Sequence, residues 1–179
     1  ALLGFRALRR WRTPSFVWLL GASLYFYAVG EPKYLLLLGA ATFLDYFVGA
    51  AIATESRPAR RKLLLACSVV GNLGMLGVFK YGDFILETTE RVLRALGWSV
   101  VLGRLGWGLP IGISFYSFQT LSYSIDIYRR TLKPARNLLE FSLFVSYFPQ
   151  LVAGPIVRAA EFLPQLDAPP RRATAAIGP

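Results

Sequence analysis

The chain has 179 residues, of which 55% are hydrophobic and 15% aromatic, and it contains no histidine. Its apolar residues are gathered into long uncharged blocks, which excludes an ordinary soluble domain, where they would recur in short periodic stretches. The formal net charge of +10 comes largely from basic residues that cluster between these blocks. Topology determinants of membrane proteins are placed in this way, so we expect no nucleic-acid partner.

Five blocks have the length of a membrane segment. About 20 apolar residues are needed to cross a hydrocarbon core of about 30 Å. Residues 13–30, 63–79, 105–125 and 141–157 carry no charged side chain, and residues 34–54 carry one, Asp45. The sequence therefore predicts an all-α fold: a polytopic transmembrane helical bundle with about five membrane segments in a lipid bilayer.

Turn and breaker residues divide the first half of the chain. We expect helices over 14–29 and 33–53, then a basic loop, then a helix over 63–79 that "KYGD" at 80–83 ends. Residues 84–96 place apolar and charged side chains on opposite faces, which is typical of an amphipathic helix lying in the membrane interface.

The second half begins with a glycine-punctuated segment whose tryptophans, Trp98 and Trp107, suit the headgroup level. A helix over about 110–128 follows. A last helix begins near Asn137, a plausible N-cap, and meets Pro149 partway along.

Loop charges predict the orientation of the bundle. The net charge is +4 over 1–12, +3 over 55–62 and +2 over 126–140, against 0 over 31–33 and +1 over 80–104. Cytoplasmic loops are the more basic ones in membrane proteins. We therefore expect 55–62 and 129–136 to be cytoplasmic, and 31–33 and 97–108 to lie outside.

The helix over 110–128 carries a polar face. Gln119, Tyr123 and Asp126 are spaced i, i+4 and i+7 and share one side, with Ser117 near it and Phe118 opposite. Polar groups at membrane depth must meet protein or a water-filled cavity. Both alternatives stay open: hydrogen bonds between packed helices, or the lining of a solvated path.

The stretch "FVSYFPQLVAGPIVR" at 144–158 predicts a broken helix. Pro149 removes a backbone donor, and irregular backbone at membrane depth is tolerated where it lines a cavity or is buried in protein. Gln150 and Arg158 would then point inward. The alternative is an ordinary helix end with Arg158 reaching the interface.

Asp45 is a carboxylate in the middle of an apolar block. An isolated charge there costs several kcal/mol, so we expect Asp45 to have a partner or to be protonated. A structural hydrogen bond to a neighbouring helix is the favoured interpretation. No histidine, cysteine pair or phosphate-binding loop is present, and no metal site is expected. The residues alone therefore indicate a membrane bundle with a polar interior, and they do not identify a reaction.

Three ordered stretches extend this interpretation. "GNLGMLGVFKYGDF", "LPIGISFYSFQTLSYSIDIYRR" and "YFPQLVAGPIVR" closely resemble the membrane-bound O-acyltransferase family. The likeness covers about Ser15 to Gln165 and is to the branch of bacterial alginate O-acetylases and related polysaccharide acetylation proteins.

The resemblance implies a bundle of many helices around a tunnel that joins the two membrane faces. It also implies an intramembrane histidine that acts on an acceptor hydroxyl, which attacks an acyl thioester. In that family the histidine lies downstream of the "GPI" motif. Residues 1–179 are thus expected to be the N-terminal part of a single membrane-embedded acyltransferase domain, truncated at both ends, with no catalytic residue and inactive alone.

The function implied by the resemblance is transfer of an acyl group, expected to be acetyl, to hydroxyls of an exported polysaccharide such as alginate. The acyl thioester or other acyl donor is a substrate, and no bound cofactor is expected. The expected partners are the lipid bilayer, the polysaccharide and other polysaccharide-acetylation proteins, with a multi-pass location in a bacterial inner membrane. The substrate-tunnel candidates are Gln119, Tyr123, Asp126, Gln150 and Arg158.

Two alternatives remain open. One is D-alanyl transfer to teichoic acid, which the family also includes. The other is a non-enzymatic membrane transporter or scaffold.

Overall fold

The computed structural model of the protein describes residues 11–30, 32–147 and 157–167. These residues form helices and connecting loops, and no strand occurs among them, which confirms the all-α class. The helices are α2 (Arg12–Gly30), the short 3-10 helix η1 (Pro32–Tyr34), α3 (Leu35–Thr54), α4 (Pro58–Ala95), α5 (Ile113–Tyr128), α6 (Leu138–Ser146) and α8 (Ala159–Asp167).

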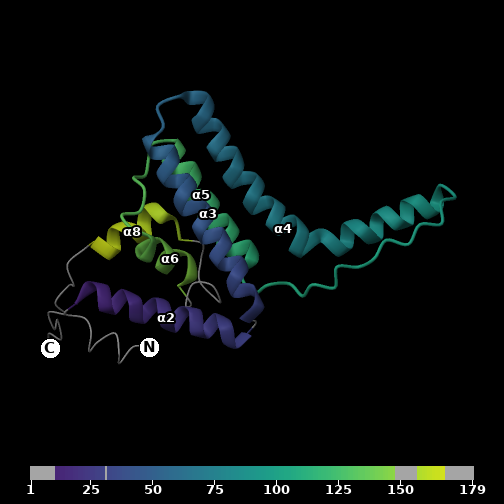
Figure 1. Cartoon of the computed structure of the whole chain (residues 1–179), viewed down its shortest axis with the longest axis horizontal. Coiled ribbons are helices and arrows are strands. Elements are labelled where there is room, and N and C mark those ends of the chain that lie inside the picture. The colour runs from purple at the N-terminus through teal and green to yellow at the C-terminus, as the bar shows by residue number, and fades with distance from the viewer. Residues whose placement is uncertain (1–10, 31, 148–156, 168–179) are drawn as a thin grey trace, which may run out of the picture.

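Three helices form the centre of the molecule. α3, the first half of α4 and α5 pack side by side, α2 runs across one end of them, and α6 and α8 lie on the side away from α4 (Figure 1). The core between them is made of large apolar side chains, among them Tyr116, Tyr123, Phe141 and Phe144, all fully buried.

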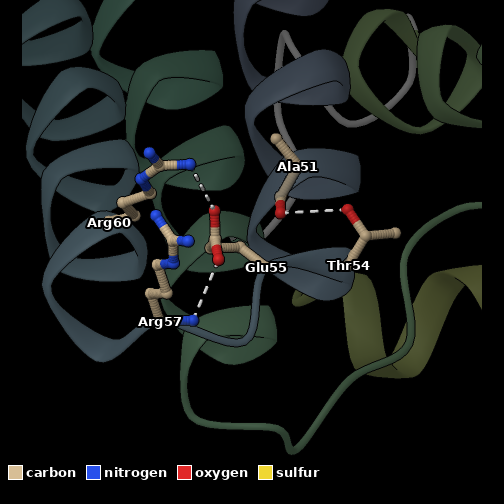
Figure 2. A network of polar contacts seen from close by, with 5 residues as sticks. All are labelled: Ala51, Thr54, Glu55, Arg57 and Arg60. Carbon is tan, nitrogen blue, oxygen red and sulfur yellow. Dashed lines mark hydrogen bonds and ion pairs between the residues drawn. The ribbon is translucent and has the colours of Figure 1, made fainter.

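The connection between α3 and α4 is short and held by one carboxylate. After Thr54 the backbone becomes extended at Glu55, and Pro58 occupies the first turn of α4, where its fixed φ and missing N–H are tolerated. Glu55 accepts a hydrogen bond from the Arg57 backbone N–H (2.9 Å) and pairs with Arg60 (3.8 Å), as Figure 2 shows. The chain therefore reverses direction within three residues, 55–57, so that α3 and α4 lie antiparallel.

α4 differs from the sequence prediction. It is a continuous helix of 38 residues through 80–83, so the predicted break there is wrong. The segment contains no proline, and a single glycine costs only about 1 kcal/mol relative to alanine in a helix. The helix does change direction partway along, and its second half leaves the bundle (Figure 1).

The last predicted helix also differs. Its N-cap is confirmed, because Asn137 accepts a hydrogen bond from the Glu140 backbone N–H (2.8 Å). The helix, however, ends at Ser146 and does not reach Pro149. A proline ring clashes with the carbonyl four residues before it and disfavours helical backbone at the preceding residue, so the helix ends early. The predicted irregularity at 149–155 lies outside the described residues.

Two stretches have the length and composition of a membrane-crossing helix: Pro32–Thr54, with a mean hydropathy of 1.9, and Pro58–Ala95, with 1.7. The other described helices are shorter or more polar. Together with the apolar side chains exposed on the outside of the bundle, these helices indicate a membrane-associated protein.

A glycine permits the close approach of α3 and α5. A Cβ atom built on Gly49 would lie 2.6 Å from Cε1 of Tyr123 and 3.0 Å from Cδ1 of Ile127. Gly39, ten residues earlier in α3, has nothing within 4 Å of the same position. The two glycines therefore form a matched pair on one helix, one at a contact and one in open space.

We expect Gly49→Ala to destabilise the full-length protein by about 1–3 kcal/mol, because overpacking a filled contact forces side chains or backbone to move. Unfolding of the purified protein in mixed micelles measures the change. Gly39→Ala is the control and should leave stability unchanged or slightly raised, since alanine is the better helix former. Equal stability of the two variants would contradict the close α3–α5 approach.

Candidate functional site

A buried carboxylate stands at the centre of the bundle. Asp45, in the middle of α3, has no exposed surface. Its Oδ1 accepts hydrogen bonds from the hydroxyls of Ser68 on α4 and Ser124 on α5 (3.1 Å for Ser124), and its Oδ2 accepts one from the amide Nδ2 of Asn72 (2.6 Å). The expected partner of Asp45 is thus confirmed as a set of neutral donors from two neighbouring helices.

The network continues beyond the carboxylate. Asn72 Oδ1 accepts a hydrogen bond from the Thr120 hydroxyl (3.0 Å), and Asn72 Nδ2 also donates to the Ser68 carbonyl (3.0 Å). All of these side chains are fully buried. Both oxygens of Asp45 and both ends of the Asn72 amide are therefore used, and α3, α4 and α5 are joined by one polar cluster at the level of Asp45.

Sequence reasoning missed most of this cluster. The signal was present as pairs of small polar residues spaced i, i+4, Ser68 with Asn72 and Thr120 with Ser124, inside apolar blocks. Ser117, predicted to lie near the Gln119 side of α5, is spaced i, i+3 and i+7 with Thr120 and Ser124 and so shares their side. α5 therefore carries polar residues on two sides.

The other polar side of α5 meets α6 and the loop before it. Gln119 Nε2 donates to the Phe144 carbonyl near the end of α6 (2.9 Å). The Tyr123 hydroxyl accepts from the Ala135 backbone N–H (3.1 Å), and its ring packs on Phe141 with centroids 4.4 Å apart. Phe118 lies on the exposed side of α5, as predicted. Both tunnel candidates on this side thus make contacts between helices.

One atom of this side has no such contact. Gln119 is 1% exposed, and its Oε1 finds no hydrogen-bond partner in the part of the chain that the structure describes. The hydroxyls of Tyr116 and Ser117 share this property. The Ser117 hydroxyl can turn toward a carbonyl of its own helix, whereas the amide oxygen of Gln119 is an acceptor only. It needs a donor from outside α5.

The remaining tunnel candidates are not brought to this place. Asp126 is half-buried near the end of α5, where its backbone carbonyl accepts from Thr131 and Leu132 in the turn that ends the helix. Arg158 is exposed, and its carbonyl accepts the first backbone hydrogen bonds of α8, from Glu161 and Phe162. Gln150 lies outside the described residues. Of the five predicted residues, Gln119, Tyr123 and Asp126 thus share one side of α5, and Gln119 and Tyr123 are the two that are fully buried there.

The described residues beside α5 include one apolar depression and no metal-binding group. Among the residues that the structure describes, no group of three or more His, Cys, Asp or Glu side chains could hold a metal ion. An open, mainly apolar depression of about 390 Å³ lies at the start of α5 and includes Phe115 and Phe118 in its lining. It does not include Gln119 or Tyr123.

The two basic loops meet at one end of the bundle. Arg61, 7% exposed in the first turn of α4, donates to the carbonyl of Tyr128 at the end of α5 (2.8 Å) and lies 5.5 Å from the centre of its ring. A cation at a helix C-terminus is favourable for the last carbonyls and the helix dipole. Arg61 therefore holds 55–62 beside the loop that follows α5.

The weakly charged connections meet at the opposite end. The Tyr34 hydroxyl donates to the Gly108 carbonyl, and the Tyr27 hydroxyl donates to the Ile111 carbonyl (3.0 Å). Residues predicted to share the cytoplasmic side are therefore found at one end of α3, α4 and α5, and residues predicted to lie outside are found at the other.

The sequence of the chain is similar to those of proteins named for O-acetyl transfer. The chain is 39% identical over 153 residues to a protein named "Probable alginate O-acetylase" of Pseudomonas aeruginosa, a match that covers 83% of this chain and 29% of that protein. A protein of the same name from Pseudomonas putida is 38% identical over 153 residues, with coverage of 83% and 31%. The chain is also 34% identical over 190 residues to the "Peptidoglycan O-acetyltransferase" of Helicobacter pylori, with coverage of 91% and 35%.

The chain thus spans about a third of the length of the curated relatives it matches. No family model and no solved structure matches it.

The Asp45 cluster yields a prediction on stability. We expect Asn72→Ala to cost about 1–3 kcal/mol of unfolding free energy, because it leaves one oxygen of the buried Asp45 carboxyl without a donor. In the double variant Asp45→Ala/Asn72→Ala the unpaired oxygen is gone, so its cost should be smaller than the sum of the single costs by about 1–3 kcal/mol. Unfolding titrations of the full-length protein in mixed micelles measure both.

The control for this prediction is Thr54→Ala. The Thr54 hydroxyl is exposed and donates only to carbonyls of its own helix, those of Ala50 and Ala51 (3.2 Å each), the latter drawn in Figure 2. Its removal should change stability little. Strict additivity of the Asp45 and Asn72 variants would contradict the network.

Proposed function

We propose that the whole protein transfers an acetyl group to hydroxyls of a polysaccharide. The proposal starts from the homology of this chain to the alginate O-acetylases, a branch of the membrane-bound O-acyltransferases. The observation that carries the proposal is identity of 34–39% across most of the chain to proteins named for O-acetyl transfer to two different glycan polymers. What these names share is the acetyl group and a sugar hydroxyl as its acceptor. The motif resemblance to this branch is thereby confirmed.

The proposed reaction sets requirements that the bundle must meet. The acceptor oxygen forms a bond to the acetyl carbon of a thioester or other acyl donor, the leaving group departs, and the hydroxyl proton passes to a base. Donors near the carbonyl oxygen stabilise the negative charge that develops there. We assign no base to this sequence, which contains no histidine. Its contribution is to position the acceptor.

Gln119 is the strongest candidate for that role. Its Oε1 is a buried acceptor with no partner in the described residues, while its Nε2 is fixed on the Phe144 carbonyl. A sugar hydroxyl that approached this face would find an oriented acceptor. Tyr123, one turn away and fully buried, holds the same face against the loop at Ala135. Asp126, Gln150 and Arg158 stay in the proposal as further lining groups.

The proposed setting is a multi-pass protein of the bacterial inner membrane. α3, the first half of α4 and α5 are three of the five proposed segments, and the apolar blocks at 13–30 and 141–157 are assigned as the other two by their length in the sequence. The end that carries 55–62 and 129–136 faces the cytoplasm, because it is the more basic end. The polysaccharide is then modified from the opposite side, and other polysaccharide-acetylation proteins are its expected partners.

The Gln119 proposal is tested by Gln119→Leu in the full-length protein. If the residue lines the reaction path, acetyl transfer per molecule of enzyme should fall by roughly tenfold or more, since each 1.36 kcal/mol of barrier is a factor of ten. If it only joins helices, the loss averages about 0.6 kcal/mol of stability, which a large protein tolerates. Acetylation of the polysaccharide, divided by the amount of protein in the membrane, is the measurement.

Phe118→Leu is the matched control, one residue away on the exposed side of α5. It should leave both abundance and activity close to those of the unaltered protein. Equal losses at the two positions that follow protein abundance would show that the face is structural only.

The orientation is tested by cysteine labelling with Cys67, which is exposed, first replaced by Ala. Arg57→Cys should react with a membrane-impermeant maleimide only after the cells are opened. Val101→Cys, whose parent side chain is 83% exposed, should react from outside. Labelling of position 57 in intact cells would contradict the proposed topology.

A further inference from the structure

The second half of α4 and the segment after it form an arm that projects from the bundle (Figure 1). We define the arm as residues 80–110 and its non-helical part, 97–110, as the return segment. The return segment runs back from the far end of α4 toward the start of α5 (Figure 1). It is fixed where it rejoins the bundle, because Trp107 stacks on Phe79 with ring centroids 4.9 Å apart.

The return segment is fastened to one side of α4. The Asp83 carboxylate accepts a hydrogen bond from the Leu105 backbone N–H (2.7 Å), and Arg104 pairs with Glu87 (2.5 Å). A Cβ on Gly82 would lie 2.6 Å from Cδ1 of Leu105, so a larger residue there would make the Leu105 side chain move. We call the contacts of Asp83 and Glu87 with the return segment the latch.

The latch covers the charged side of the helix and leaves the apolar side free. Glu87 also pairs with Arg91 (3.7 Å) and Glu90 with Arg94 (2.6 Å), so the acidic groups of this side have partners within the arm. At 100° per residue, the large apolar side chains gather on another side of the helix. Each has about half or more of its surface exposed: Tyr81, Phe84, Ile85, Val92 and Leu96.

The position of the arm indicates what covers this apolar side. The arm begins where the uncharged block at 63–79 of α4 ends, at the end of the bundle where Tyr34 meets Gly108. A helix that leaves a crossing segment at that level lies at the membrane surface. Apolar and aromatic residues on one side with arginines on the other are typical of helices that lie in the interface. Trp98, 63% exposed at the far end, fits the same level.

We propose that the arm lies on the lipid surface as a two-layered unit. The Phe84 and Val92 side enters the boundary between headgroups and acyl chains, and the return segment lies on the aqueous side. The latch determines this rotation, since it holds the charged side of the helix against the return segment. The partner is the bilayer itself. The inference is independent of the acetyl-transfer reaction and goes beyond it.

Spin labels on the full-length protein in nanodiscs test the proposal. A label at Val92→Cys reports on the apolar side, and one at Arg94→Cys reports on the charged side, both in the background without Cys67. The label at 92 should be more accessible to oxygen, which concentrates in lipid, than to a water-soluble nickel complex. The label at 94 should show the reverse. Nickel access at both positions would mean an arm in water, and access of neither reagent at 92 would mean that protein covers this side; either result overturns the proposal.

The role of the latch is tested separately with Asp83→Ala/Arg104→Gln. Without the latch, the two positions should lose their opposite preferences and give similar oxygen-to-nickel ratios. Arg91→Gln is the matched control, since it removes an ion pair of Glu87 that does not involve the return segment. It should preserve the difference between positions 92 and 94. A difference that survives the double variant would show that the latch does not set the rotation.

Discussion

The burial of one carboxylate constrains the whole bundle. Asp45 lies in an apolar block with no exposed surface, and a charge in such a place is costly unless donors surround it. The donors come from two different helices, Ser68 and Asn72 on α4 and Ser124 on α5. The hydrogen bonds are directional, so they fix both the height and the rotation of α4 and α5 relative to α3. A shift of one residue along α4 would exchange Ser68 and Asn72 for Val69 and Leu73, or for Cys67 and Gly71, and would break these hydrogen bonds.

The Asp45 hydrogen bonds also determine which loops meet at each end of the bundle. With Asn72 and Ser124 fixed at the level of Asp45, Arg61 at the start of α4 reaches the last carbonyls of α5, and the two basic loops lie together. At the opposite end, Tyr27 and Tyr34 reach the segment that precedes α5. The asymmetry of charge seen along the sequence thus becomes an asymmetry between the ends of one rigid unit, which is the arrangement that a membrane protein with fixed topology requires.

Local signals in the sequence predicted most of the helices, and long-range contacts account for the differences. Pro32 and the Asn137 cap act on their own neighbourhood, so α3 and the start of α6 were predictable within a few residues. The start of α4 was placed too late, at 63, because its first turn from Pro58 is basic and was taken for a loop. The break at 80–83 was inferred from Gly82 and Asp83, but both residues serve the return segment: glycine makes room for Leu105, and Asp83 accepts its N–H. Asp83 and Leu105 are 22 residues apart along the chain, so a local sequence pattern cannot show their contact.

Spacing along the sequence also failed to show which polar residues of α5 have partners on other helices. From spacing alone, Gln119 and Ser117 looked like members of one polar face. The structure separates α5 into a side that Asp45 and Asn72 saturate and a side that ends in the unpaired Oε1 of Gln119. In this network both oxygens of the Asp45 carboxylate and both ends of the Asn72 amide are used, which stabilises helix packing. The Ser117 hydroxyl on the same side of α5 has no partner among the described residues. If Gln119 acts as we propose, the substrate hydroxyl donates to the acceptor left on the side of α5 toward α6. The Asp45 network then holds that surface in place.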